Sequence, residues 1–308
     1  MGVRVIRFKI PVNCANAAQD AEEIYDDYGV VALPESYCET GQAMRLVVFC
    51  HGAGGTVSET DSQAEQQTLT KYLLANGYAV MDVNGLPAEY AQKKEIDIRN
   101  NIGSPIAVQS YIKAYRYCIE RFHLKKEAFV HGVSMGGISS TNLVLSNQIP
   151  VIAQSGFCPV LDTYHQIFLH PWSDGAPKVA LRKLYGLTLD DNKEPVYDAD
   201  KVDGYNPMSR LIRADDGKEY LYYPVPVKFW QCEDDEIVDI ACTKRFVTAM
   251  QNAGVNADLR TFESGGHEPQ LYGDFVAQPR GNTLFGTEVL RITPAVEETY
   301  LWIKGFDR

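Results

Sequence analysis

The chain has 308 residues, 45% of them hydrophobic, which is enough to bury a large core in one α/β domain or in two smaller domains. With 40 acidic and 29 basic residues its net charge is −11, and no cluster of Lys and Arg offers the positive surface that nucleic acid or an anionic membrane would need. A neutral or cationic small molecule is the easier partner, and we expect no nucleic-acid partner.

Targeting signals are absent from the sequence as given. The opening stretch MGVRVIRFKIPVN lacks the apolar segment of a signal peptide, and no stretch reaches the roughly 18 apolar residues of a membrane span. We therefore expect a cytoplasmic protein, or a secreted or periplasmic one if a leader has been removed. The seven cysteines are odd in number and widely spread, which indicates free thiols in a reducing compartment. No sequence feature indicates the oligomeric state.

The first half of the chain alternates short β-branched runs with longer amphipathic segments. We predict strands at Arg4–Ile10, Tyr28–Leu33, Arg45–His51, Ala79–Asn84, Glu127–Gly132 and Val151–Gly156, and helices at Ser62–Asn76, Pro105–Phe122 and Met135–Ser146. Strands joined by crossover helices are typical of an α/β protein with a mainly parallel central sheet and helices on both faces.

The regular pattern stops between Gly156 and Val225. These 70 residues are rich in Pro, Asp and aromatic residues, with one predicted helix at Pro177–Tyr185. The pattern then resumes with strands at Pro226–Cys232 and Ala257–Phe262, and with helices at Ile240–Ala253 and Pro294–Ile303. We predict one domain over residues 1–308, in which residues 156–225 are an inserted lid.

The stretch HGVSMGG, residues 131–137, lies where a predicted strand ends and a helix begins. A sharp strand-to-helix turn strains the backbone of its central residue and leaves no room for side chains at the two flanking positions. Gly132 and Gly136 occupy these positions and have no side chain. Such a turn would expose the hydroxyl of Ser134 and direct the N–H of Met135 toward an oxyanion. A glycine-bearing loop with a capping serine is the alternative.

A serine nucleophile needs a base and a carboxylate that orients the base. The acidic turn in FWQCEDDEIVD follows one predicted strand, and His267 lies in a glycine loop, FESGGHEP, after the next strand. Serine, acid and histidine thus occur in the order expected when the three groups follow successive strands of one sheet.

Other interpretations of these polar residues stay open. His51 ends a strand, and the order of the groups argues against it as the base, while His131 is most simply a core histidine. The acids between residues 233 and 239 could bind calcium, although an acidic turn is more often solvated surface. No CxxC pair or zinc-spaced His pair occurs, so we expect no metal site.

On these motifs the sequence resembles the α/β-hydrolase superfamily, in particular its serine esterases and lipases, from Leu46 to the C-terminus apart from the insertion. The resemblance implies Ser134 as the nucleophile and His267 as the base. The acid turn of that family, G-x-x-D-x-x-V, is matched from Cys232 to Val238 with cysteine in place of glycine. This register makes Asp235 the acid.

Two assignments implied by the resemblance have alternatives. Cysteine at the glycine position leaves Asp234 as a second candidate for the acid. The oxyanion motif HG-x-G is matched by HGAGGT at residues 51–56, with Ala53 as the second N–H donor beside Met135, and Gly54 as the alternative donor.

The implied activity is hydrolysis of carboxylic esters through an acyl-enzyme, without a cofactor. A peptidase or acyltransferase with the same three groups is an alternative, as is a non-catalytic ligand-binding protein of this fold. Tyrosines in the insertion, with Trp172 and His170 as candidate substrate contacts, indicate small acyl or aryl esters, among them acetyl or feruloyl esters linked to carbohydrate.

Overall fold

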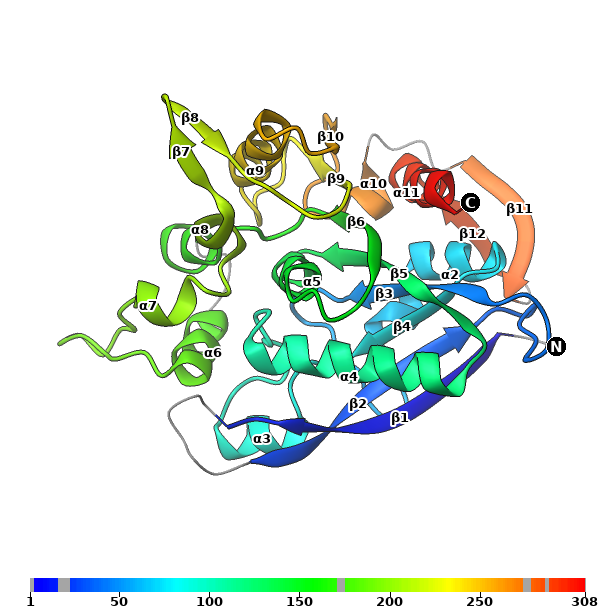
Figure 1. Ribbon diagram of the computed structural model, residues 1–308, viewed down its shortest axis with the longest axis horizontal. Helices are drawn as coiled ribbons and strands as arrows, with labels where there is room; N and C mark the ends of the chain where they lie inside the picture. Colours follow the sequence, from blue (N-terminus) through cyan, green and yellow to red (C-terminus); the bar gives the residue numbers. More distant parts are fainter. Residues whose placement is uncertain (1–2, 16–22, 171–174, 274–277, 286–287, 308) are drawn as a thin grey trace.

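The computed structural model describes residues 3–15, 23–170, 175–273, 278–285 and 288–307. Its centre is an eight-stranded sheet with the strand order β1-β2-β4-β3-β5-β6-β9-β10 (Figure 1). The strands are β1 (Arg4–Asn13), β2 (Ile24–Leu33), β3 (Met44–Cys50), β4 (Ala79–Val83), β5 (Leu124–Val133), β6 (Val151–Phe157), β9 (Val227–Cys232) and β10 (Ala257–Phe262). β2 pairs antiparallel with β1 and β4, and all other pairs are parallel, so the predicted mainly parallel sheet is confirmed.

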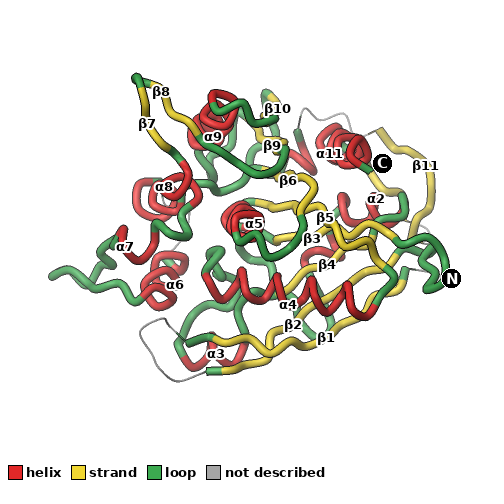
Figure 2. Tube along the Cα trace, viewed as in Figure 1, coloured by secondary structure: helices red, strands yellow, loops and turns green. Residues whose placement is uncertain are grey.

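Helices cover both faces of the sheet, and Figure 2 shows the strands as a twisted band between them. One buried apolar cluster joins the sheet to α3 (Ala88–Lys93), α4 (Pro105–Arg121), α5 (Gly136–Leu145) and α9 (Ile240–Asn252). The second cluster joins the opposite face to α1 (Gln63–Gln66), α2 (Thr68–Ala75) and α11 (Pro294–Phe306). The sheet therefore lies between two layers of helices, as the sequence predicted.

Several elements differ from the sequence prediction. The single helix expected at Ser62–Asn76 is two helices, because Gln67 has an extended backbone and ends α1 before α2 begins. Helices α3 and α10 (Pro269–Tyr272) and the hairpin of β11 (Gln278–Phe285) and β12 (Glu288–Ile292) were not predicted. Short helices and an irregular hairpin with register shifts carry little periodicity, which explains the omission.

The segment between β6 and β9 lies beside the sheet, on the left of Figure 1. It contains a π-helix, η1 (His165–Leu169), the helices α6 (Ala176–Tyr185), α7 (Ala199–Val202) and α8 (Pro207–Leu211), and the hairpin of β7 (Arg213–Asp215) and β8 (Lys218–Tyr220). Only α6 was predicted. Buried side chains of this insertion, including Leu181 and Leu221, belong to the same apolar cluster as α4 and α5.

Membrane spans and disulfides were both expected to be absent. Among the described residues, no helix combines the length and apolar character needed to cross a bilayer. All seven cysteines are free thiols, and five of them are buried.

His131 lies in β5 and is fully buried. Its Nδ1 lies 2.8 Å from the hydroxyl oxygen of Ser155 on β6, and its ring stacks on Phe49. Burial disfavours the charged imidazolium and lowers the pKa of His131 from its ordinary 6.5 to about 3.

This buried imidazole should make the protein sensitive to acid. Between pH 6.5 and about 3 the unfolded chain binds a proton at His131 and the folded chain does not. The free energy of unfolding should therefore fall as the pH drops, by up to about 1.4 kcal/mol per pH unit from this group. His131→Asn should flatten that slope, whatever its effect at pH 7. Urea unfolding at pH 7, 6 and 5 measures the slope, and equal slopes in both proteins would contradict the assignment.

Candidate active site

Ser134 occupies a tight turn between the end of β5 and the start of α5. Its φ is +53°, a left-handed value that costs a non-glycine residue about 1–3 kcal/mol. Three backbone hydrogen bonds hold the turn: the Ser134 N–H donates to Phe157 at 3.0 Å, and its carbonyl accepts from Gly137 and Val160, both at 2.8 Å. The strained backbone is thus fixed from both neighbouring segments.

The two glycines that flank the turn are required by close backbone contact. A Cβ at Gly136 would lie 2.0 Å from the carbonyl oxygen of Cys50, at the end of β3. A Cβ at Gly132 would lie 2.4 Å from the Ser140 hydroxyl and 2.5 Å from the Gly136 carbonyl oxygen. Neither contact can be relieved without moving backbone or the helix, so the G-x-S-x-G spacing follows from packing.

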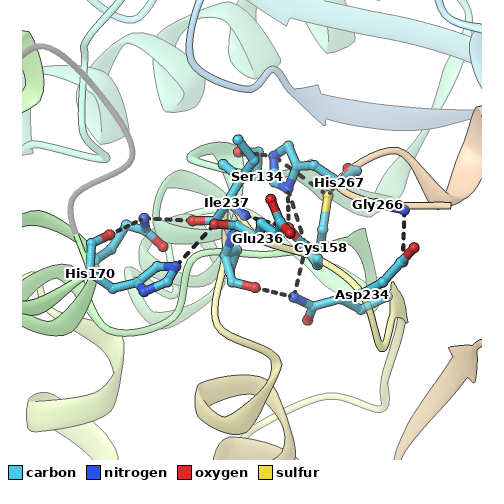
Figure 3. Close-up of polar contacts among 12 residues, drawn as sticks. Ser134, Cys158, His170, Asp234, Glu236, Ile237, Gly266 and His267 are labelled. Atoms are coloured by element: carbon cyan, nitrogen blue, oxygen red, sulfur yellow. Dashed lines mark hydrogen bonds and ion pairs between the residues drawn. The ribbon is translucent and has the colours of Figure 1, made fainter. Parts of the chain in front are cut away.

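The three groups of the predicted triad converge in space, and Figure 3 shows the side chains of Ser134 and His267 next to each other. His267 Nε2 lies 2.9 Å from Ser134 Oγ, and His267 Nδ1 lies 3.0 and 3.1 Å from the two carboxylate oxygens of Asp235. Ser134 is 7% exposed, and the Asp235 side chain is fully buried. The three residues follow β5, β9 and β10, whose parallel carboxyl ends meet at one edge of the sheet.

The Asp235 carboxylate is held by hydrogen bonds from its own loop. It accepts from the backbone N–H groups of Ile237 and Val238, both at 3.0 Å, and from the Gln231 amide at 3.0 Å. A carboxylate that only accepts favours the tautomer in which His267 Nδ1 carries the proton. The Nε2 lone pair then faces the Ser134 hydroxyl, which is the arrangement of a general base.

Asp234, the alternative acid, has a different partner. Its carboxylate accepts from the backbone N–H groups of Gly265 and Gly266, at 3.2 and 2.8 Å (Figure 3). Both glycines have positive φ. Asp234 therefore fixes the backbone that leads into His267, while Asp235 contacts the imidazole itself.

The candidate oxyanion donors lie on both sides of Ser134. Met135 follows it directly, and the loop after β3 forms a turn closed by a 3.1 Å hydrogen bond from Gly55 to Gly52. That loop touches the serine turn, since a Cβ at Gly52 would lie 3.2 Å from the Cβ of Ser134. Within the described part of the chain, neither the Met135 nor the Ala53 N–H donates a hydrogen bond. Gly54, the alternative donor, occupies the same turn with a φ of +84°.

His51, where this loop begins, is buried, and among the described residues its side chain makes no hydrogen bond with Ser134. Its Nδ1 lies 3.0 Å from Asp82, which also accepts from the Tyr111 hydroxyl at 2.9 Å. Burial acts to lower the pKa of His51, but the Asp82 carboxylate outweighs it and the pKa is raised. These contacts hold His51, the first residue of the loop that carries the candidate oxyanion donors.

The sequence suggested His170 and Trp172 as substrate contacts, and the structure describes only the first of them. His170, at the end of η1, places Nε2 3.1 Å from the carbonyl oxygen of Glu236, one residue past Asp235 (Figure 3). His170 therefore contacts the loop that follows β9 and carries Asp235, residues 233–239, which we call the acid loop. Trp172 lies outside the described residues.

Sequence reasoning missed Cys158. Its Sγ lies 3.0 Å from the His267 carbonyl oxygen and 3.9 Å from Nε2, and its φ of +40° is unusual for a non-glycine residue. Burial raises the pKa of Cys158 well above its ordinary value, so the group is a neutral thiol that packs behind the imidazole. The only signal in the sequence was its position one residue after a strand.

Among the described residues, two groups of His, Cys and Asp side chains could hold a metal ion. Cys158, Asp235 and His267 form one group and His165, Asp239 and Cys242 the other, with ligand atoms within 4.8 Å of one another in each. In the first group both imidazole nitrogens already have protein partners.

Comparisons with known proteins identify the architecture. No protein-family model matches the sequence, and no curated protein does. Solved structures do match: Pyrococcus horikoshii acylaminoacyl peptidase has a TM-score of 0.61 at 13% identity, over 100% of this chain and 42% of that one. The chain has the α/β-hydrolase fold. The resemblance drawn from the motifs is thereby confirmed at the level of the fold.

Two esterase structures share this α/β-hydrolase architecture. The lipase/esterase from Lactobacillus plantarum has a TM-score of 0.56 at 16% identity, over 85% of this chain and 90% of that one. Esterase B from Lactobacillus Rhamnosis (HN001) has a TM-score of 0.57 at 16% identity, over 98% and 85%. The chain spans about two fifths of the length of the peptidase that it matches and most of the length of both esterases.

The different partners of the two aspartates predict different effects on the reactivity of Ser134. Asp235→Asn should slow covalent labelling of Ser134 by a fluorophosphonate by several orders of magnitude, on the order of 10⁴, because the amide favours the wrong histidine tautomer. Asp234→Asn should slow it far less, since it changes only backbone contacts. Labelling rates followed by mass spectrometry test this, and a larger loss at Asp234 would reverse the two roles.

Proposed function

We propose that the protein is a serine hydrolase that cleaves carboxylic esters through an acyl-enzyme on Ser134. The observation that carries the proposal is the unbroken line of contacts from the Ser134 hydroxyl through His267 to Asp235, at 2.9 and 3.0 Å. Acyl transfer requires a nucleophile with a base beside it and hydrogen-bond donors for the oxyanion. Ser134 with His267, and the backbone N–H groups of Met135 and Ala53, would supply them.

In the first step, His267 Nε2 takes the hydroxyl proton while Ser134 Oγ bonds to the ester carbonyl carbon. The carbonyl oxygen becomes an anion and accepts hydrogen bonds from the N–H groups of Met135 and Ala53; loss of one such donor typically costs about 2.7–4 kcal/mol of transition-state stabilisation. Asp235 stabilises the imidazolium that forms. The bond to the alcohol oxygen then breaks, and His267 returns the proton to the leaving alcohol.

In the second step, a water molecule takes the place of the alcohol. His267 accepts its proton as the oxygen attacks the acyl carbon, and the same N–H groups stabilise the second oxyanion. The bond to Ser134 Oγ breaks, Oγ regains its proton from His267, and the carboxylic acid leaves. The cycle consumes one water and needs no cofactor.

Small acyl or aryl esters are the substrates that the surroundings favour. A cavity of about 770 Å³ lies against η1 and α6, and six charged side chains line it: Glu95, Asp97, Lys178, Arg182, Lys193 and Glu194. Gln166, also in its wall, donates to the Ile237 carbonyl oxygen at 2.9 Å and so joins the cavity to the acid loop. None of the triad or candidate oxyanion residues lines this cavity; as a place for the alcohol part of a substrate, its charged lining would suit a sugar better than a long acyl chain.

We propose that the insertion, residues 156–225, is a lid that contributes to this specificity through His170 and Trp172. Not all of its aromatic residues are free for that role. Tyr185 is partly buried against the apolar core, Tyr223 is buried, and the Tyr223 hydroxyl donates to Gln154 of β6, so these rings attach the insertion to the body. Tyr164, which stacks on Phe168 and remains 38% exposed, is better placed to meet a ligand.

A peptidase is the second candidate, because acylaminoacyl peptidase matches the whole length of this chain. The groups that form the acyl-enzyme would be the same, and only the leaving group, an amine in place of an alcohol, would differ.

Ser134→Ala should abolish hydrolysis of p-nitrophenyl acetate and leave the fold intact, since the hydroxyl contributes little packing. Turnover and a thermal melt of both purified proteins measure this. Ser146→Ala, at the far end of α5, is the matched control and should keep full activity. Ester turnover retained in Ser134→Ala would remove the nucleophile assignment.

Substrate chain length separates the candidate activities. We expect turnover to fall from acetyl to palmitoyl esters and to be detectable on acetylated or feruloylated sugars. An N-acetylated amino-acid anilide, measured in the same series, reports peptidase activity. Preference for the longest acyl chain would refute the small-ester assignment, and preference for the anilide would favour the peptidase.

A further inference from the structure

A second cluster of metal-binding side chain types lies apart from the triad. His165 is the first residue of η1, and Asp239 and Cys242 are the N-cap and a first-turn residue of α9. Each offers one ligand atom, and the three atoms lie within 4.8 Å of one another. The cluster therefore joins the insertion to the helix that follows the acid loop.

The contact between His165 and Asp239 is not an ordinary hydrogen bond. His165 Nε2 lies 3.0 Å from Asp239 Oδ2, but the two are not aligned as donor and acceptor, and this buried nitrogen has no hydrogen-bond partner among the described residues. Asp239 Oδ1 is already used, since it accepts from the Ala241 N–H at 2.9 Å. A nitrogen and an oxygen that approach side by side are arranged like two ligands of one cation.

The electrostatic surroundings also favour a cation. The carboxylates of Asp162 and Asp239 both act on the Cys242 thiol, and Arg245 opposes them. Asp162 accepts from the His165 N–H at 3.1 Å and lies beside the cluster. Arg245 is the facing positive charge, and it is paired with Glu219 at 2.6 Å.

We propose that His165, Asp239 and Cys242 bind a divalent cation of the zinc type. An imidazole nitrogen, a carboxylate oxygen and a sulfur are ligands that Zn²⁺ accepts together, whereas Mg²⁺ and Ca²⁺ require oxygen. Zinc bonds of about 2.0–2.3 Å place tetrahedral ligands roughly 3.3–3.8 Å apart, which small side-chain adjustments can reach here. Water would complete the four ligands.

The bound cation would fasten the insertion to the acid loop. His165 precedes Gln166, whose amide donates both to the His170 carbonyl oxygen and to Ile237 in that loop. Asp239 follows Asp235 by four residues. The site touches none of the triad side chains, so its existence does not depend on the proposed hydrolase activity.

Cobalt provides the test, because Co²⁺ takes zinc sites and a thiolate ligand gives it a charge-transfer absorption band. Tag-free protein in a reducing buffer should bind one Co²⁺ at the cluster with this band and a dissociation constant below about 10 µM, and Zn²⁺ should displace it. Calcium in excess should not. Binding should also raise the melting temperature.

Variants locate the ion. Cys242→Ser should abolish the band, and His165→Gln should weaken binding by more than the roughly 10- to 100-fold that loss of a residue outside the ligand set costs. Cys38→Ser, at an exposed free cysteine, is the matched control and should change neither. His267→Ala removes the other candidate group, Cys158, Asp235 and His267, and should leave the Cys242 band intact.

Four results would overturn the proposal: no cobalt binding in this range, a thiolate band that survives in Cys242→Ser, a band lost only in His267→Ala, or unchanged affinity in His165→Gln. Circular dichroism of the metal-free variants checks their folding. If Cys242→Ser does not fold, the cobalt affinity of His165→Gln is the deciding measurement, because an unchanged affinity in that variant excludes the site.

Discussion

The site depends on how closely α5 approaches the end of β3. The Gly136 backbone lies so near the Cys50 carbonyl that no side chain fits between them. This contact fixes the first turn of α5 against the loop that begins at His51, and with it the distance between the serine turn and the candidate oxyanion donors. Because β3 and β5 are adjacent parallel strands, both segments leave the sheet at the same edge. Backbone packing thus sets the positions of the candidate nucleophile and of the candidate oxyanion donors.

The sequence indicated that Ser134, Asp235 and His267 would come together, because the constraints on this arrangement are local. The glycines around Ser134 indicate a close backbone contact, and the strand pattern predicts the position of the turn. The order of residues along the chain puts His267 after Asp235. The spacing from Asp235 to Val238 also has a structural reason, since the Val238 N–H donates to that carboxylate. Each of these signals lies within a few residues of the group that it identifies.

What the sequence did not predict depends on contacts between distant segments. Cys158 is 109 residues from His267, and nothing near either residue indicates that they meet. His165 and Asp239 are likewise brought together only by the packing of η1 on α9. The short elements of the insertion have too few residues for a periodic pattern, and the extended backbone at Gln67 interrupts a helix whose apolar spacing continues through it.

The attachment of the insertion at both ends limits how the site can open. At the start, Cys158 and Val160 donate to the backbone of Trp230 and Ser134; at the end, Leu221 donates to the Ala249 carbonyl oxygen. Hinged rotation of the whole insertion would break these bonds and expose buried side chains. If the insertion is the lid proposed above, these bonds at its two ends would stay in place when it opens, and the geometry of the serine turn would be unchanged.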